Sequence, residues 1–374
     1  MAGGGGEDLT ERTFILRAPL ASVPRLDLGH YLAFTQDGEP RRVPIGSGGL
    51  TIGRVAPNDL VIASPDISRR HCKIEPDGEG ALLTDLGSTN GSFVGGERAE
   101  KPVRLGNGTR FTLGSFTMTY ERRDRREVAE EEGLAEELRR AMDYVRAILP
   151  QPIADGPVRT DWWFVPSSRL GGDAFGYQFL DDRTFAGFVL DVSGHGIGSS
   201  MHAANVANAL RRRALPGVDF RDPAAVAAGL NAMFPMEEHN GLMLTLWYFV
   251  YDAPTRGLRF CAAGHHPAYL LAPGAREAEP LWARSPAIGM LPGGRWSVGA
   301  ATVAPGSRLY VFSDGAFEIV PAGGGAWGIE DLRRIFAQPE AGAAEAQRIY
   351  QAVRAAAGTG PLDDDFSLLA VRFA

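Results

Sequence analysis

This 374-residue sequence has only two cysteines, no long apolar run and no net positive charge, and each of these features excludes a class of protein. The two cysteines, Cys72 and Cys261, lie far apart within apolar segments. We therefore expect buried free thiols in a reducing compartment rather than a disulfide scaffold. The longest apolar run, Leu242 to Tyr251, is about half the length that a bilayer requires.

The N-terminus and the overall charge narrow the possibilities further. The opening sequence MAGGGGEDLTER has no basic flank followed by an apolar stretch, so we expect no secretory signal. The formal net charge is -7, whereas a nucleic-acid-binding domain needs a basic face. The sequence therefore predicts a cytoplasmic protein that binds neither a membrane nor nucleic acid.

The length of the chain predicts more than one domain. A hydrophobic share of 44% and a charged share of 22% are those of an ordinary globular protein. Single hydrophobic cores usually stop growing before about 300 residues, so we expect two or three domains.

The first part of the chain has the pattern of an all-β sandwich. Residues 1–28 are punctuated by Gly and Pro without a sustained period, which predicts a flexible tail. Residues 29–122 contain short apolar segments separated by turns such as PDGEG and STNGS. Apolar side chains alternate between Phe111 and Tyr120, as in paired strands.

A charged helix is predicted over residues 123–150, which we interpret as a linker. It is rich in helix-forming residues and is closed by Pro150. Two interpretations of its narrow apolar seam stand side by side: a solvated helix that lies on a neighbouring domain, or the preferred alternative, a short coiled-coil contact that forms a homodimer. The seam consists of Leu134, Leu138, Ala141, Val145 and Ile148.

Residues 151–374 mix strands and helices in the manner of an α+β domain. A hairpin is predicted to turn at Asp181 to Arg183, and a helix to follow, started by Ser199 or Ser200. Further strands are expected at LMLTLWYFVYD, LRFCAAG, PAYLLA, RLYVFSD and FSLLAVRF, with helices around 330–337 and 343–356. Strands that arrive in runs favour α+β layers over a parallel sheet.

Four aspartates at predicted strand ends carry the chemistry of this region. Each stands beside Gly or another acid, in GGDAFG, DVSGHG, FSDGAFE and PLDDDFS, where a tight turn can present a carboxylate. Carboxylates gathered in one place repel one another unless cations lie between them, which favours hard metals with oxygen ligands. The pattern predicts a two-metal hydrolase. The four residues are Asp173, Asp191, Asp314 and Asp364.

Three loops of the predicted sandwich resemble those of the forkhead-associated (FHA) domain. They contain the motifs GRVAPNDLVI, SPDISRRHCKIE and DLGSTNGSFV in the family order. The resemblance implies that a phosphothreonine peptide binds there, its phosphate to a guanidinium and neutral donors on a rigid rim. His71 is expected to brace the loops rather than touch the ligand. The phosphopeptide-binding residues are expected to be Arg54, Ser68, Arg69, Thr89 and Asn90.

The stretch from 151 to 374 resembles the SpoIIE-type branch of the PPM metal-dependent serine/threonine phosphatases. The matching pieces include PSSRLGGDAF, FAGFVLDVSGHGIGSSMHAA, LRFCAAGHHPAYLL and DDDFSLLAVRF. The resemblance implies a four-layer α-β-β-α sandwich with two divalent cations, Mn²⁺ or Mg²⁺. It also implies hydrolysis by water activated between the two ions, without a covalent phosphoenzyme.

The same resemblance implies a role for each acidic residue. Asp191 would bridge the two cations with help from the Val192 carbonyl. Asp314 and Asp364 would bind one ion, and Asp173 would support the other. Asp364 is chosen from the run 363–365 because Asp365 directly precedes Phe366-Ser367, as in the family's Asp-Asp-aliphatic-Thr ending, and Asp363 is expected to be solvated.

The sequence departs from the family pattern at two positions. Gly176 stands where many relatives have a further Asp, and Ser193 where the animal-type enzymes have a His. The general acid is therefore unassigned: His195, His202 and His265 are candidates, and a structural role is the alternative for each. The run 211–213 of arginines either attracts an acidic substrate or complements a helix dipole.

Two hypotheses for the function follow. The first is a phosphoserine/phosphothreonine protein phosphatase that its FHA domain targets or regulates, with an anti-sigma factor antagonist as the substrate that the resemblance implies. The second is a phosphothreonine-binding adaptor with an inactive phosphatase fold. The FHA ligand is expected to be a serine/threonine kinase, the kinase's target, the substrate or another copy of this chain.

Overall fold

The computed structural model divides the chain into two compact units, Met1–Leu134 and Ala135–Ala374. It describes residues 26–36, 39–147, 149–167, 171–194, 196–321, 323–338, 344–358 and 362–374. Within those ranges, no helix has both the length and the apolar character needed to cross a membrane.

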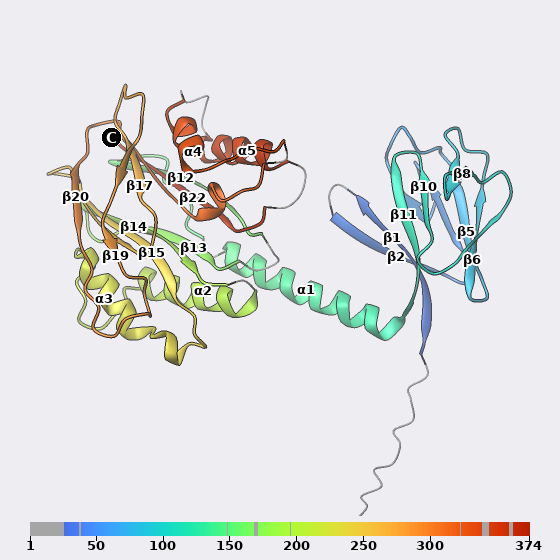
Figure 1. Ribbon diagram of the computed structural model, residues 1–374, viewed down its shortest axis with the longest axis horizontal. Helices are drawn as coiled ribbons and strands as arrows, with labels where there is room; N and C mark the ends of the chain where they lie inside the picture. The colour runs from blue at the N-terminus through green and yellow to red at the C-terminus, as the bar shows by residue number, and fades with distance from the viewer. Residues whose placement is uncertain are drawn as a thin grey trace, which may run out of the picture. The chain divides into compact units, whose positions relative to one another are not determined.

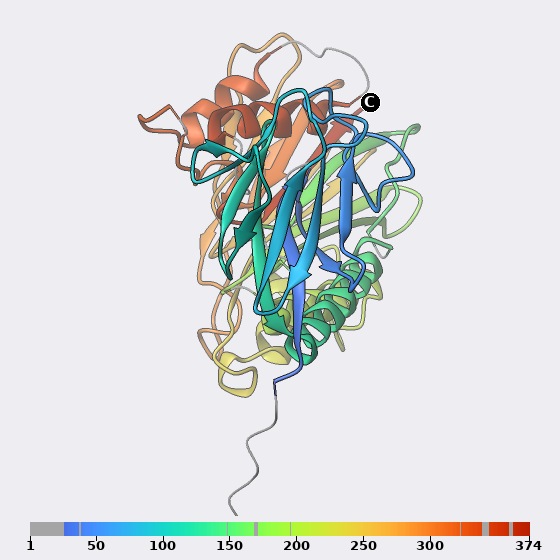
Figure 2. The same ribbon diagram turned by 90° about the vertical axis from the view of Figure 1, so that its right-hand side faces the viewer.

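The first unit is a sandwich of two sheets, drawn in blue to cyan in Figures 1 and 2. One sheet has the strand order β2-β1-β11-β10-β7-β8 and the other β4-β3-β5-β6-β9. The strands are β1 (Leu28–Gln36), β2 (Glu39–Ile45), β3 (Leu50–Gly53), β4 (Leu60–Val61), β5 (Cys72–Asp77), β6 (Gly80–Asp85), β7 (Ser92–Val94), β8 (Glu97–Arg98), β9 (Val103–Leu105), β10 (Arg110–Leu113) and β11 (Phe116–Asp124).

Alternating apolar residues of both sheets form the core of this unit. Phe111 and Leu113 on β10 and Met118 and Tyr120 on β11 are all buried, as the period of two predicts. The predicted all-β sandwich is therefore confirmed. The loops after β3, β4 and β6, rather than the strands, carry the expected phosphopeptide residues.

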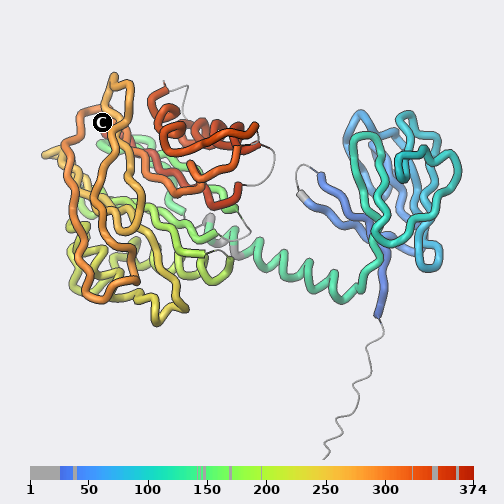
Figure 3. Tube along the Cα trace, in the orientation of Figure 1, coloured from blue at the N-terminus to red at the C-terminus, as the bar shows by residue number. Residues whose placement is uncertain are grey.

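Strand β11 continues without a break into helix α1 (Arg125–Ala147), as the chain trace in Figure 3 shows. Its first turns are tied to the first unit, because the Glu131 carboxylate accepts two hydrogen bonds from Arg123, at 2.8 and 2.6 Å, and one from Arg42 at 3.0 Å. The division between the units falls between Leu134 and Ala135, inside this helix.

The second unit contains two further sheets and four more α-helices among the residues that the structure describes. One sheet has the order β12-β22-β21-β17-β18, and the other β13-β14-β15-β16-β19 with β20 on β16. The strands are β12 (Val158–Val165), β13 (Asp173–Phe179), β14 (Thr184–Val192), β15 (Leu244–Asp252), β16 (Gly257–Ala263), β17 (Ala268–Leu271), β18 (Glu279–Leu281), β19 (Arg284–Ser285), β20 (Gly299–Thr302), β21 (Arg308–Phe312) and β22 (Phe366–Phe373). The helices are α2 (Ile197–Arg211), α3 (Pro223–Met233), α4 (Ile329–Phe336) and α5 (Glu345–Ala357), with short 3-10 turns η1 (Met236–Glu238) and η2 (Asp314–Ala316).

These elements form four layers, α-β-β-α. One core lies between the two sheets and includes Trp247 and Val371. A second lies between α2, α3 and the β13–β16 sheet, and a third between α4, α5 and the β22–β21 sheet. Figure 1 shows the helix pairs on the outer faces of the two sheets. The four-layer fold is therefore as predicted.

One local prediction for this unit is wrong, and one helix was not predicted. Helix α2 begins at Ile197 after Gly196, whose φ of 96° suits glycine, so neither Ser199 nor Ser200 is its cap. The Ser199 hydroxyl instead donates to the Ser193 carbonyl at 3.2 Å. Helix α3 was not predicted, although the Asp222 side chain caps it and Pro223 occupies its first turn.

Candidate metal centre and phosphopeptide surface

Asp173 and Asp191 lie directly opposite each other on neighbouring strands. Asp173 is the first residue of β13, Asp191 the penultimate residue of β14, and the two are paired in the antiparallel register. Residues paired in this way have Cβ atoms about 5 Å apart on one face of the sheet. This sheet therefore contributes two adjacent carboxyl groups at one end.

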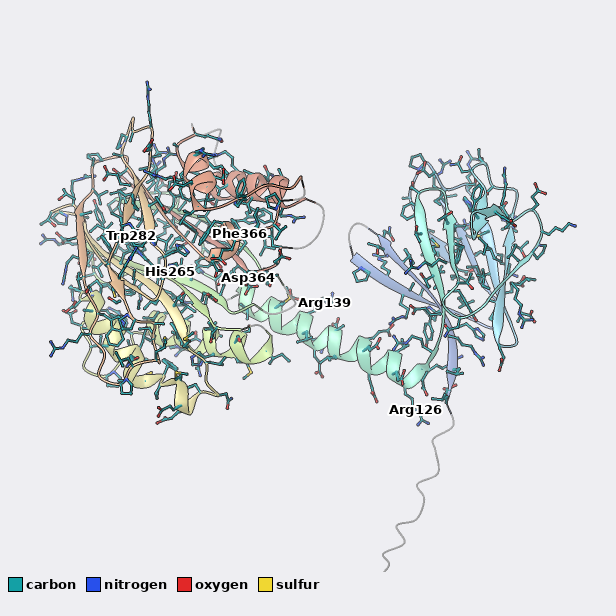
Figure 4. All side chains as sticks on the ribbon, viewed as in Figure 1. Arg126, Arg139, His265, Trp282, Asp364 and Phe366 are labelled. Atoms are coloured by element: carbon teal, nitrogen blue, oxygen red, sulfur yellow. The ribbon has the colours of Figure 1, made fainter. Side chains whose placement is uncertain are left out.

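The other sheet contributes Asp314 and Asp364. Asp314 begins the turn η2 directly after β21, and Asp364 lies two residues before β22. Both acids raise the pKa of Asp191, so they lie close enough to it for their charges to interact. Figure 4 labels Asp364 beside Phe366, the first residue of β22. The structure thus brings together the four aspartates that the sequence singled out.

Asp365 is a fifth acid of this cluster, and its contacts were not expected from the sequence. It is 5% exposed, and its Oδ1 accepts hydrogen bonds from the Ser167 N–H at 2.7 Å and hydroxyl at 2.9 Å. Its Oδ2 accepts from the Gly172 N–H at 2.6 Å and, more distantly, the Asp173 N–H at 3.4 Å. Asp365 therefore holds the backbone that leads into Asp173.

Gly171, which directly precedes Gly172, is required because the Asp365 carboxylate leaves no room for a side chain at this position. A Cβ atom on Gly171 would overlap the carboxylate of Asp365. The GGD motif therefore serves the approach of backbone to a buried carboxylate as well as the turn. The paired acids in DDDFS and the paired glycines in GGD are the sequence signal that could have indicated Asp365.

The carboxyl groups of the cluster hold one another's pKa values high. Burial, followed by the charges of Asp314, Asp364 and Asp365, raises the pKa of Asp191 to about 7. Burial and Asp364 raise the pKa of Asp314 to about 6. Burial, followed by Asp191 and Asp365, raises the pKa of Asp173 well above its ordinary value.

The donor set fits divalent cations in its chemistry. All of the clustered side-chain donors are carboxylate oxygens, which Mg²⁺ and Mn²⁺ prefer. Asp173 Oδ2 is buried and has no hydrogen-bond partner among the described residues. No three His, Cys, Asp or Glu side chains of the described ranges are arranged to hold one ion as they stand. Ligation by three of them therefore requires side chains to turn.

Val192 and the two departures from the family pattern also have defined positions. Val192 ends β14, and its carbonyl lies so close to Gly172 that a Cβ there would contact it. Gly176 faces Phe188 across the hairpin, and a Cβ on it would overlap that ring. An Asp at 176 would therefore require the Phe188 ring to shift. The Ser193 hydroxyl accepts from the Met243 N–H at 3.1 Å and fastens the loop after β14.

The histidines that were candidates for the general acid differ in their surroundings. His195 lies outside the described residues. Burial lowers the pKa of His265 to about 4, so its imidazole is neutral at pH 7 and poorly suited to donate a proton. Burial, then the charge of His239, also lowers the pKa of His202. The ring centroids of His202 and His239 are 5.1 Å apart.

The arginine run at 211–213 lies at the C-terminal end of α2. Arg211 is the last residue of the helix, and the Arg213 guanidinium donates to the Leu180 carbonyl at 3.2 Å. Asp363 is exposed, as expected of a solvated acid. Neither feature adds a ligand to the aspartate cluster.

In the first unit, the expected phosphopeptide residues come from three adjacent loops. The Ser68 hydroxyl accepts from the Thr89 N–H at 2.9 Å, and the Arg54 N–H donates to the Ser68 carbonyl at 2.9 Å. The Asn90 amide donates to the Asp66 carbonyl at 2.9 Å. These bonds hold the loops after β3, β4 and β6 together.

His71 and Arg69 also belong to these loops, His71 as a buried residue and Arg69 as an exposed one. His71 is fully buried: its Nδ1 accepts from the Ser68 N–H at 3.2 Å, and its Nε2 lies 3.2 Å from the Gly91 carbonyl oxygen. Arg69 is exposed and Arg54 partly exposed. The phosphopeptide loops are therefore held in place by the buried His71, and the guanidinium groups of Arg54 and Arg69 are accessible to solvent.

Comparison with known proteins agrees with both units. Residues 181–374 match the family model of Stage II sporulation protein E (SpoIIE), and residues 50–114 match that of the FHA domain. Phosphoserine phosphatase RsbP of Bacillus subtilis is 27% identical over 183 residues, which are 49% of this chain and 45% of RsbP. Transcriptional regulatory protein EmbR of Mycobacterium tuberculosis is 32% identical over 81 residues, 22% of this chain and 21% of EmbR.

Among solved structures, the SiaA-PP2C domain of Pseudomonas aeruginosa matches with a TM-score of 0.54 at 22% identity. The match covers 66% of this chain and 99% of that domain, and at this identity it shows the fold alone. The chain spans less than half the length of the curated relatives named above. Since the family model covers more than half of the chain, this protein belongs to the SpoIIE family and carries an FHA domain N-terminal to the family's phosphatase fold.

Proposed function

We propose that this chain is a metal-dependent protein serine/threonine phosphatase that its FHA domain targets or regulates. The proposal depends on the position of four aspartates: Asp173 and Asp191 from one sheet lie close to Asp314 and Asp364 from the other. In addition, Oδ2 of Asp173 is buried and has no hydrogen-bond partner among the described residues. RsbP, which matches in this region, is named a phosphoserine phosphatase.

Each residue of the cluster has a part in this proposal. Asp191, with the Val192 carbonyl, would bridge two divalent cations, Mn²⁺ or Mg²⁺. Asp314 and Asp364 would hold one ion, and Asp173 would support the other. When bound, the cations would neutralise phosphoryl charge and activate water. Asp365 would keep the Asp173 backbone in place through the Gly172 N–H.

The phosphopeptide-binding loops of the FHA domain would select the protein on which the enzyme acts. Arg54, Ser68 and Arg69 would bind the phosphate of a phosphothreonine, and Thr89 and Asn90 the peptide backbone. A serine/threonine kinase or its target is the ligand class that we propose. An anti-sigma factor antagonist is the proposed substrate, and the cytoplasm the proposed location.

We further propose that residues 29–122 form the reader, 123–150 the linker and 151–374 the catalytic domain. In the second unit, Val145 and Leu149 line a small cavity together with Asp173 and Ala207 of α2. The end of the linker thus reaches the first residue of the aspartate cluster. This contact supports a role for the linker in regulating the enzyme.

The test is phosphate release from a small aryl phosphate and from a phosphoserine peptide, with and without Mn²⁺. We expect hydrolysis that EDTA abolishes, that Asp314→Asn loses and that the exposed control Asp363→Asn retains. The alternative is a phosphothreonine-binding adaptor with an inactive phosphatase fold. It predicts phosphothreonine binding without any metal-dependent hydrolysis, and that result would refute the phosphatase.

A further inference from the structure

Methionines are concentrated in one part of the second unit. The chain has eight methionines, and five of them fall between positions 201 and 290. Methionine has a flexible, polarizable side chain that adapts to partners of different shape, so it is frequent on surfaces that bind other proteins. The five residues are Met201, Met233, Met236, Met243 and Met290.

Hydrogen bonds hold the segments that carry these methionines together. The buried Asn231 of α3 accepts from the Gly289 N–H at 2.8 Å and donates to the Leu291 carbonyl at 3.0 Å. The Met236 N–H of η1 donates to the Gly289 carbonyl at 3.0 Å. The end of α3, the turn η1 and the segment around Gly289 are therefore neighbours.

Helix α2 joins this group through an aromatic contact. The His202 ring packs edge-on against the Phe234 ring, with centroids 5.4 Å apart. Met201 and Met233 directly precede these two residues in the sequence. Helices α2 and α3 also share one core and cover the same face of the β13–β16 sheet (Figure 1). The first turns of α2 therefore lie beside the end of α3.

Several large apolar side chains of these segments are open to solvent. Met201 is 68% exposed, and Ile197, one helical turn before it, is 50% exposed. Met290 and Leu291 are 50% and 51% exposed, and Met233 is also exposed. Single exposed apolar residues are ordinary, but a group of them is typical of an interaction site. These five residues are called the methionine surface below.

The methionine surface begins beside the aspartate cluster. Ile197 is the first residue of α2, which follows the loop after Asp191. In that loop the Ser193 N–H donates to the Met243 carbonyl at 2.9 Å, and the Ser193 hydroxyl accepts from the Met243 N–H at 3.1 Å. Thr245 is paired in register with Asp191. A protein whose phosphoserine reaches the cluster therefore brings the residues beside it onto the methionine surface.

The end of the linker lies against a different side of α2. The cavity at this end is lined by Ser200, Ala204 and Ala207 of α2, but by neither Ile197 nor Met201. The methionine surface is therefore open to another protein.

We propose that the methionine surface docks the substrate protein, an inference that rests on the phosphatase function proposed above. It binds apolar residues that flank the phosphoserine, while the phosphate reaches the aspartate cluster. Because methionine adapts to apolar partners of different shape, the preference is for apolar flanks rather than for one sequence.

The experiment compares two phosphoserine peptides that differ only at the flanking positions, which are leucine in one and serine in the other. Phosphate release at saturating Mn²⁺ gives kcat/KM for each peptide. We expect the leucine peptide to be preferred by roughly tenfold, from partial burial of its side chains. Met201→Ser with Met290→Ser should remove most of this preference, and Met201→Leu with Met290→Leu should keep it. Trp282→Ser, which removes an exposed apolar residue elsewhere in the same unit, should keep it too.

The outcomes separate this inference from the phosphatase function. Melting temperatures verify that every variant is folded. Equal kcat/KM for the two peptides, or an unchanged preference in the double serine variant, would overturn the docking surface alone. A lower mass of that variant than of the wild type in light scattering would assign the surface to a second copy of the chain and also overturn the inference. No hydrolysis of either peptide or of a small aryl phosphate would overturn the phosphatase function, and the docking surface with it.

Discussion

Asp365 Oδ2 accepts a hydrogen bond from the Gly172 N–H at 2.6 Å across 193 residues of sequence. The bond joins the start of β22, next to Asp364, to the segment that leads into Asp173. A shift of either strand end would therefore move both expected metal ligands together. Asp365 is best described as a positioning residue, since its own oxygens are occupied by backbone and hydroxyl donors.

We predict that Asp365→Asn impairs the enzyme through this segment. An amide nitrogen in place of one carboxylate oxygen cannot accept from Gly172 or Ser167, and an unsatisfied buried group costs about 1–3 kcal/mol. Unfolding should therefore occur at lower temperature, and half-maximal activity should need more Mn²⁺. Titration of activity with Mn²⁺, beside calorimetric melting, measures both.

Asp363→Asn is the matched control, because Asp363 is exposed and lies in the same acidic run. It should leave the melting temperature and the Mn²⁺ requirement unchanged. A wild-type Mn²⁺ requirement in Asp365→Asn would show that the carboxylate does not position the site.

We predict that Asp191→Asn loses most activity and yet stabilises the metal-free protein at alkaline pH. The pKa of Asp191 is about 7 in the folded state and near 4 when unfolded, so between these values the folded state binds more protons. Stability of the metal-free wild type should thus fall as the pH rises through this window, by at most about 1.4 kcal/mol per unit from this group.

Melting in EDTA at pH 5 and at pH 8 tests this expectation. The wild type should melt at a lower temperature at pH 8 than at pH 5, and Asp191→Asn should reduce that difference. Equal pH dependence of the two proteins would mean that Asp191 is not held among other negative charges. Wild-type turnover of Asp191→Asn at saturating Mn²⁺ would contradict its role as a bridging ligand.

The sequence predicted what local pattern controls and missed what depends on long-range contacts. Alternation and turn residues predicted the all-β sandwich, the resemblance to SpoIIE-type phosphatases implied the four-layer fold, and the motifs identified the four aspartates. The role of Asp365 depends on backbone donors 193 positions away, which no spacing reveals. The contact of Met243 with Ser193 likewise depends on how two loops meet in the fold. The start of α2 was misplaced because glycine conformation at Gly196 outweighed the capping preference of serine.

We predict that Arg54→Ala prevents phosphothreonine binding without changing the chemical step. Loss of a charge-assisted contact costs roughly 1.5–3 kcal/mol, about ten- to a hundredfold in affinity. Fluorescence anisotropy with a phosphothreonine peptide measures the affinity, and hydrolysis of a small aryl phosphate should remain normal. Arg110→Ala, which removes an exposed arginine of β10, is the control. Unchanged peptide affinity in Arg54→Ala would place the phosphate elsewhere.

We predict that the apolar seam of α1 forms a dimer contact. Leu134 is 54% exposed and Leu138 is partly exposed, whereas Val145 already lines a cavity within the second unit. Only the stretch around Leu134 and Leu138 is therefore available to contact a second copy of the chain. Ile148, the last residue of the seam, lies outside the described residues. Leu134→Glu with Leu138→Glu would bring charge into a contact of this kind and should convert a dimer to a monomer.

Light scattering coupled to gel filtration at tens of micromolar measures the mass of each protein. Glu132→Lys, a charge change at an exposed position of the same helix, should leave the dimer intact. Hydrolysis of a small aryl phosphate by the double variant separates assembly from catalysis, because neither leucine lines the cavity beside Asp173. A wild type that is already monomeric, or a double variant that stays dimeric, would limit the seam to contacts within one chain. A monomeric double variant with normal hydrolysis would instead assign Leu134 and Leu138 to dimer formation alone, and leave Val145 and Leu149 as the part of the linker that acts on the aspartate cluster.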